Sequence, residues 1–140
     1  MTTIEEIKSF LDGLGTLGTI KMSFMPHDPD VIGCLYEYPG QMPQRQFGTV
    51  GVMYERPALQ LVFRGAAFDY LGPRVKSEIA YRAFVAVQPG ALSGSISTKY
   101  LQIDPLQPPF QLGSLDANNR VRIAFNFYPY RSSRECSTNR

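Results

Sequence analysis

Hydrophobic residues recur at two different spacings along the chain and thereby predict two helices and five strands. Near the N-terminus they recur every three or four positions, as in a helix with one buried face: Ile4, Ile7, Phe10, Leu11 and Leu14. Thr3 and Glu6 match a capping box, which predicts the start of this helix. Gly13, Gly15 and Gly18 predict its end, because glycine adopts the left-handed conformation that closes a helix.

Alternation of apolar and polar residues, the pattern of a half-buried strand, follows in five places. The predicted strands cover residues 20–25, 31–38, 59–64, 96–103 and 120–128. Between the second and third strands, the prolines and glycines of residues 39–51 predict a long loop, because proline donates no hydrogen bond to a sheet ladder.

A second helix is predicted from Pro73, a residue that is favourable in the first helical position. Five apolar residues form a stripe along it: Val75, Ile79, Ala83, Ala86 and Val87. We expect this stripe to pack on the sheet, which leaves Tyr81 and Val85 pointing outward. Arg74 and Glu78 are spaced for an ion pair one turn apart.

This order of elements predicts an α+β fold: a mainly antiparallel β-sheet of about five strands with two α-helices packed on one face. Residues 1–131 are expected to form a single domain with the long loop at 39–51. Residues 132–140 form a polar C-terminal tail that we expect to be disordered.

Composition and charge narrow the functional classes. The 140 residues carry 14 Lys and Arg against 12 Asp and Glu, a net charge of +2 that is too small to predict non-specific nucleic-acid binding. No apolar run is long enough for a membrane span, and the N-terminus lacks the pattern of a signal peptide. We therefore expect no membrane partner and a protein that is made in the cytoplasm and stays there unless an assembly carries it elsewhere.

Two cysteines, Cys34 and Cys136, leave two possibilities open. A disulfide between them is conceivable, but two free thiols are favoured, because Cys34 lies in a predicted strand and Cys136 in a polar tail. Neither has further Cys or His at the spacing of zinc ligands, so no metal site is expected.

Candidate catalytic groups are few. His27, the sole histidine, could bind a hard cation or act as an acid/base pair with Asp28 and Asp30, but a solvated turn is the favoured interpretation. Glu37 and Glu55 flank the predicted loop and could form paired carboxylates for hydrolysis. No nucleophile elbow or phosphate-binding loop is present, so we expect neither an enzyme nor a cofactor.

Aromatic residues and arginines without catalytic partners are more prominent. Tyr and Arg are enriched at protein interfaces, where they fill pockets at modest entropic cost. Nine residues are therefore predicted to form an oligomer or assembly interface: Tyr38, Arg45, Phe47, Tyr54, Arg56, Tyr81, Val85, Tyr128 and Arg131.

Short motifs along residues 1–128 resemble those of the tail-terminator and minor capsid proteins of tailed bacteriophages. The motifs, in order, are Tyr38-Pro39-Gly40, Phe47-Gly48, Glu55-Arg56-Pro57, Leu59 to Phe63, Tyr70, Tyr100 with Ile103, Pro109 to Gly113, Asp116 to Arg120, and Asn126-Phe127. The expected turn sequence Asp-Glu-Asn-Gly-Arg is replaced by Asp116-Ala117-Asn118-Asn119-Arg120.

The resemblance implies a structural virion protein of the tail and neck. Such a protein forms a ring, typically a hexamer, that caps the tail tube, stops its polymerisation and offers a surface for docking the head. The implied partners are further copies of the chain, the tail tube protein and a head-closure or connector protein, while genomic DNA passes through the ring without sequence-specific binding. A head-closure or connector protein, another minor tail protein, a small hydrolase, and a nucleic-acid-binding module that uses the C-terminal arginines are the alternatives.

Overall fold

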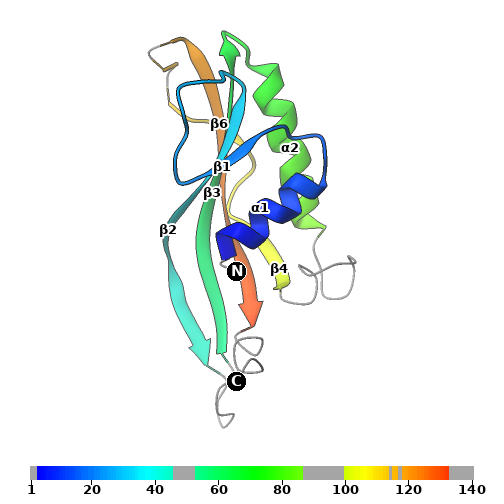
Figure 1. Ribbon diagram of the computed structural model, residues 1–140. Helices are drawn as coiled ribbons and strands as arrows, with labels where there is room; N and C mark the ends of the chain where they lie inside the picture. The colour runs from blue at the N-terminus through cyan, green and yellow to red at the C-terminus, as the bar shows by residue number, and fades with distance from the viewer. Residues whose placement is uncertain (1–2, 46–52, 87–99, 114, 117, 133–140) are drawn as a thin grey trace.

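A computed structural model describes residues 3–45, 53–86, 100–113, 115–116 and 118–132 (Figure 1). Within these ranges two helices and six strands form an α+β fold, which confirms the predicted class. In chain order the elements are α1 (Thr3–Gly13), β1 (Ile20–Met22), β2 (Ile32–Arg45), β3 (Met53–Ala67), α2 (Leu71–Val85), β4 (Tyr100–Pro105), β5 (Phe110–Gln111) and β6 (Arg120–Ser132).

The strands form one mixed, mostly antiparallel sheet in the order β1-β2-β3-β6-β4, with β5 pairing with β6. Only β1 and β2 run parallel among the described strand pairs. The short strand β5 is an addition to the predicted set. It pairs Phe110 with Ala124, beyond the part of β6 that pairs with β4.

Both helices pack on the same face of the sheet, as predicted. Ile7 and Leu11 of α1 and Phe84 of α2 are fully buried in one hydrophobic core. The centre of the Phe84 ring lies 4.5 Å from that of Phe127 on β6 and 5.8 Å from that of Phe10 on α1. Alternate residues of β3 and β6 point toward this face because successive side chains of a strand point in opposite directions.

The predicted buried stripe of α2 is wrong. The helix buries Pro73, Ser77, Ala80 and Phe84. Of the predicted stripe, Val75, Ile79 and Ala86 are exposed and Ala83 is partly buried, while Val87 lies outside the described residues. It also begins at Leu71, two residues before the predicted start.

A close contact between α2 and β3 accounts for this rotation of the helix. An added Cβ on Gly65 of β3 would lie only 2.7 Å from Cδ of Pro73, so the absence of a side chain allows the first turn of α2 to lie directly on the strand. With Pro73 against the sheet, Ser77, Ala80 and Phe84 follow on the same side of the helix at the spacing of one turn. The contact at the first turn therefore selects the buried face.

The predicted loop at 39–51 is wrong for its first part, because β2 continues to Arg45. β1 pairs with β2 only along Gly33 to Leu35, so beyond Leu35 this side of β2 has no strand beside it among the described residues. Pro39 and Pro43 are tolerated in such an edge strand. Two register shifts against β3, one on each side of Gln41, accommodate the irregularity. Residues 46–52 lie outside the described part of the chain.

Other strand ends differ more modestly from the prediction. β1 ends at Met22 rather than at residue 25, because Ser23 adopts a positive φ of 64° that an extended strand does not allow. β3 and β6 are longer than predicted. β4 is described from Tyr100 onward and extends to Pro105, and the predicted strand residues 96–99 lie outside the described ranges.

Candidate functional site

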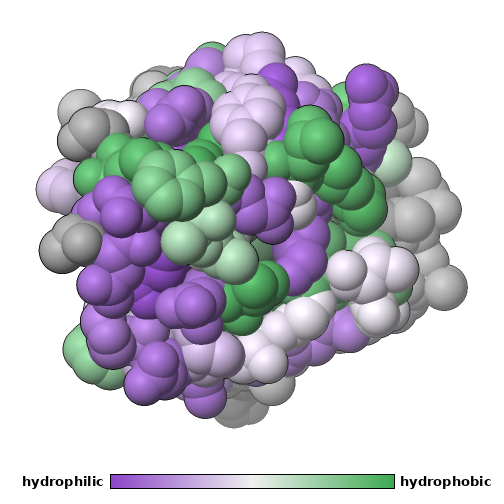
Figure 2. Space-filling view, turned by 90° about the horizontal axis from the view of Figure 1, so that it is seen from above, coloured by the Kyte–Doolittle hydropathy of each residue, from purple (hydrophilic) through white to green (hydrophobic). Residues whose placement is uncertain are grey.

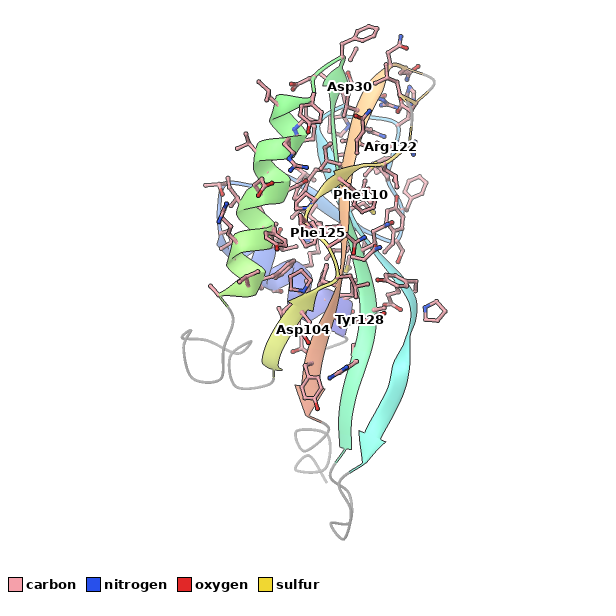
Figure 3. The ribbon with its side chains drawn as sticks, turned by 180° about the vertical axis from the view of Figure 1, so that it is seen from behind. Asp30, Asp104, Phe110, Arg122, Phe125 and Tyr128 are labelled. Carbon is pink, nitrogen blue, oxygen red and sulfur yellow. The ribbon has the colours of Figure 1, made fainter. Side chains whose placement is uncertain are left out.

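The face of the sheet that points away from the helices is rich in tyrosines and side-chain amides. Residues in register across β2, β3 and β6 form rows on this face: Tyr36, Gln60 and Asn126 in one row, and Tyr38, Ala58 and Tyr128 in the next. Tyr128 is also in register with Asp104 of β4, and the two residues lie close together in Figure 3. This face therefore offers aromatic surface with hydrogen-bonding groups between the rings.

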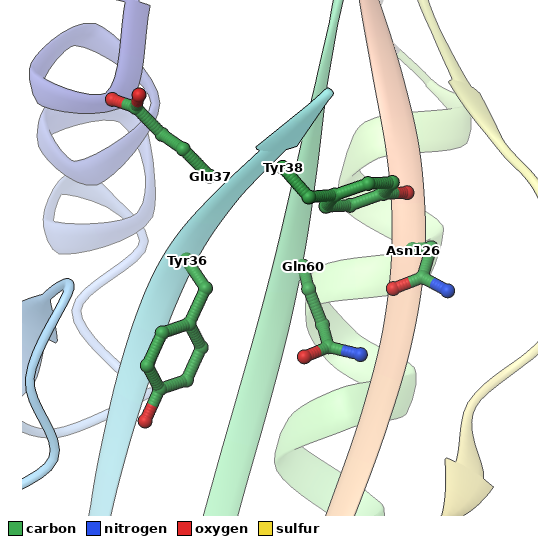
Figure 4. Close-up of a pocket in the computed structure, with 5 residues that line it drawn as sticks. All are labelled: Tyr36, Glu37, Tyr38, Gln60 and Asn126. Carbon is green, nitrogen blue, oxygen red and sulfur yellow. The ribbon is translucent and has the colours of Figure 1, made fainter. Parts of the chain in front are cut away.

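Two hollows on this face form a groove. The first has a volume of about 410 Å³ and is lined by Tyr36, Glu37, Tyr38, Gln60 and Asn126 (Figure 4). The second has a volume of about 240 Å³ and is lined by Met25, Tyr36, Gln60, Val62, Leu112 and Arg122. Because Tyr36 and Gln60 line both hollows, we treat all these residues as one feature, the sheet-face groove.

Burial favours the neutral forms of the two groove tyrosines, Tyr36 and Tyr38, and of the neighbouring Cys34. Burial, followed by the hydrogen bond with the Cys34 thiol, raises the pKa of Tyr36 to about 12. Burial also raises the pKa of the free Cys34 thiol and, together with the nearby Tyr128, that of Tyr38. A protonated, buried thiol is a poor nucleophile, so these groups favour binding over covalent chemistry.

Two buried arginines hold the segment around His27. Arg64 donates from Nη2 to the carbonyl oxygens of Pro26 and Pro29, both at 2.7 Å, and from Nε to the carbonyl of Asp30 at 3.0 Å. Arg120 donates to the carbonyl of His27 at 2.7 Å. Burial and the neighbouring Arg120 lower the pKa of Arg64.

Carboxylates complete this structural network. Asp116 lies 2.8 Å from Nε of Arg120, and Asp30 lies 3.1 Å from its Nη1. The backbone N–H groups of Asn118 and Arg120 donate to Asp116, as expected for an Asx turn. The favoured interpretation of the His27 segment as a turn is therefore consistent with its geometry. No cluster of three or more potential metal ligands occurs in the described ranges.

Glu37 and Glu55 are not placed as a catalytic pair by the backbone. Glu37 lies opposite Leu59, four positions from Glu55 along β3. Four residues of a strand span about 13 Å. Glu37 and Glu55 are therefore not direct neighbours across the two strands. The side chain of Glu55 lies outside the described part of the structure.

A second candidate surface is the outward side of α2, where Leu71, Val75 and Ile79 follow one another at intervals of four residues and are exposed. We call these three residues the α2 outer face. Phe68, just before the helix, is also exposed. The end of the molecule at which α2 begins shows hydrophobic patches between hydrophilic side chains (Figure 2). Exposed apolar clusters of this kind are typical of interaction sites.

The predicted interface residues of α2 have different outcomes. Val85 is exposed, as expected. Tyr81 is partly buried and packs edge-on against Phe125, with ring centres 5.9 Å apart, so the prediction of an outward Tyr81 is wrong. The ion pair between Arg74 and Glu78 is confirmed at 2.9 Å.

Three other predicted interface residues share the face away from the helices. Tyr38 and Tyr128 lie in one row of the sheet, and the guanidinium carbon of Arg56 lies 4.8 Å from the centre of the Tyr130 ring. The strands contain the backbones of Arg45, Tyr54 and Arg131, whose side chains are not described, and Phe47 lies outside the described ranges.

Sequence reasoning did not single out several groove residues, among them Gln60, Arg122 and Asn126. Each alternates with buried positions of β3 or β6, so strand alternation alone placed it on the outer face. What it could not indicate is that these residues come together, because that depends on the register between strands far apart in the sequence.

Comparison with known proteins yields no assignment: the chain matches no protein-family model and no curated protein sequence. No helix in the described ranges has the length and hydrophobicity needed to span a membrane.

Proposed function

We propose that the protein is a structural virion assembly protein that forms a ring on the end of the tail tube of a long-tailed bacteriophage. The ring, a hexamer by the family resemblance, stops tube polymerisation and provides the surface on which the head docks. The order of the short sequence motifs along residues 1–128 and the α+β fold support this proposal. It assigns the chain to the tail or neck of the virion and gives it no catalytic role and no cofactor.

The observation that carries the proposal is the α2 outer face. The opposite side of α2 already closes the core through Ala80 and Phe84, so the fold of the single chain does not require Leu71, Val75 and Ile79 to be apolar. Burial of such side chains against another chain is favourable by about 25 cal/mol per Å² of apolar surface. A neighbouring copy in a ring would provide that burial.

A closed ring also needs a second, different patch on each subunit, because its contacts are heterologous. The described surface offers unlike patches on the two sides of the sheet: the α2 outer face on one, and the tyrosine-rich face with Tyr38 and Tyr128 on the other. Two unlike patches on opposite sides allow each copy to contact two neighbours.

The charges of the two helices favour contact between unlike surfaces. α1 carries three acidic residues and one lysine, a net charge of −2, whereas α2 carries three basic residues and one glutamate, a net charge of +2. Two copies that met through the same α2 surface would bring like charges together. A head-to-tail arrangement avoids this repulsion.

The proposal is tested by the mass of the protein in solution and by its effect on tube length. Light scattering over a range of concentrations should detect a ring of defined subunit number, and electron microscopy should show it at one end of tubes assembled from tail tube protein. Tubes that grow past their normal length in the presence of the protein would refute the tail-terminator function. A ring that binds the isolated head connector but not the tube would instead identify a head-closure protein.

A further inference from the structure

Arg122 differs from the two neighbouring arginines, because its guanidinium has no partner among the described residues. Arg64 and Arg120 donate to carbonyls of residues 26–30, and Arg120 also donates to the carboxylates of Asp30 and Asp116. The guanidinium of Arg122 forms no hydrogen bond or ion pair with the described residues, and its Nε is buried. Arg122 as a whole is partly exposed, but a buried donor without a partner is costly, so its Nε favours an acceptor, best an anionic one, supplied from outside the chain.

The hollow beside Arg122 is small and is lined by both apolar residues and the polar Gln60 and Arg122. Met25, Val62 and Leu112 line it together with the Tyr36 ring, and its volume is about 240 Å³. This volume lies below the 300 to 1,000 Å³ or so of typical small-molecule sites. It is better suited to a single apolar side chain that enters next to the arginine.

The rest of the groove has hydrogen-bonding groups of both kinds. The hydroxyl of Tyr38 and Oδ1 of Asn126 are buried and have no partner among the described residues, and the amide of Gln60 lies beside them in the first hollow. An extended peptide offers N–H and C=O groups alternately along its length. Small rotations of Tyr38 and Asn126 would bring these atoms into reach of such a backbone.

We propose that the sheet-face groove binds an extended peptide segment of a partner protein. The segment places an apolar side chain in the hollow formed by Met25, Val62 and Leu112 and a neighbouring carboxylate on the guanidinium of Arg122. The groove shares Tyr38 with the tyrosine-rich face that the ring proposal uses. Arg122 and the hollow formed by Met25, Val62 and Leu112 belong to neither ring patch, so this inference and the ring are tested with different variants.

Charge favours a peptide over a nucleic acid as the occupant. Among the described residues that line the groove, Arg122 alone presents a charged side chain to it, because Glu37 lies opposite the core residue Leu59 and its side chain points away from the groove (Figure 4). A nucleic acid backbone is recognised by several cations along its path. A single carboxylate beside an apolar group matches one arginine beside an apolar hollow.

The test is selection from a library of random displayed heptapeptides on the immobilised full-length protein, in parallel with the variant Arg122→Gln. We expect a consensus with Asp or Glu next to an aliphatic or aromatic residue, and we expect Arg122→Gln to lose it. In a synthetic peptide of that consensus, replacing the acid by its amide should weaken binding about tenfold or more, as for loss of a charge-assisted hydrogen bond. Selection without a consensus, or a consensus without an acid, would overturn the proposal.

Two further variants separate binding from folding. Leu112→Ser should weaken binding of the same peptide by removing apolar contact, whereas Arg82→Gln on the exposed side of α2 should leave it unchanged. In nuclear magnetic resonance spectra the Nε–Hε signal of Arg122 should shift on addition of the acidic peptide but not of its amide form. An equal shift with inorganic phosphate would show a general anion site, and that result would also overturn the proposal.

Discussion

The double substitution Leu71→Glu with Val75→Glu should abolish ring assembly and leave the folded monomer intact. Leu71 is 69% exposed and Val75 is 54% exposed, so neither contributes much to the core of the single chain. Glutamate is a good helix former and is favourable near a helix N-terminus. The free energy of unfolding of the monomer should therefore change by less than about 0.5 kcal/mol, as is usual for surface sites.

The expected loss in assembly follows from the same exposed fractions. Full burial of an exposed Leu, Val or Ile side chain contributes about 1.5 to 3 kcal/mol. Scaled by exposures of 69%, 54% and 38% for Leu71, Val75 and Ile79, the α2 outer face contributes about 2 to 5 kcal/mol to each contact. Because 1.4 kcal/mol corresponds to a factor of ten, losing the first two residues weakens each contact by about tenfold or more.

Sedimentation or light scattering over a range of concentrations measures the assembly, and urea unfolding of the monomer measures the stability. Thr16→Glu, at an exposed position between α1 and β1, is a control that adds charge outside both helices. Rings that form at the same concentration in the double variant and in the wild type would refute the role of the α2 outer face. A large loss of monomer stability would show instead that these side chains belong to the core.

Three further substitutions probe the fold. Phe84→Ala should lower the free energy of unfolding by about 3 to 5 kcal/mol in urea titrations, because it removes the central ring of the aromatic cluster; a loss below 1 kcal/mol would contradict this packing. Tyr36→Phe should remove the component near pH 12 from the ultraviolet titration of tyrosine, because burial raises the pKa of Tyr36 to about 12. The same raised pKa makes Tyr36 stabilising below pH 10, and this contribution to the free energy of unfolding is lost as the pH rises toward 12. Asp116→Asn should make the free energy of unfolding depend less on pH under acidic conditions. Hydrogen bonds from Arg120 lower the pKa of Asp116 below 3.8, so the stabilisation by its carboxylate is present above that pH and is lost below it. Equal acid unfolding curves for this variant and the wild type would exclude that role.

Local patterns in the sequence were sufficient for the class of fold and for most elements. The apolar spacing of Ile4, Ile7 and Leu11 placed α1 with its buried face, and alternation identified the central parts of β2, β3 and β6. These patterns are reliable because a helix and a strand each bury one side at their own period. The turn at Asp116 was likewise readable, since its side chain bonds the backbone only a few residues away.

Contacts between distant residues decided the rest. The apolar residues of α2 fall on more than one side, and the close approach of Gly65 to Pro73, with the ring cluster around Phe84, selected which side is buried. The prolines of β2 were read as a loop because the sequence alone does not show that one side of this strand lacks a neighbour.

The candidate surfaces divide in the same way. The sequence alone shows that the chain has tyrosines and arginines for an interface and few candidate catalytic residues. Only the tertiary structure decided that Tyr81 packs against the core and that Leu71, Val75 and Ile79 are exposed. It also decided that Arg122 lies beside a small, partly apolar hollow with no partner for its guanidinium in the described part of the chain. The physical reason is that residue periodicity acts within one element, whereas exposure and pairing depend on strand register and on the rotation of each helix against the sheet.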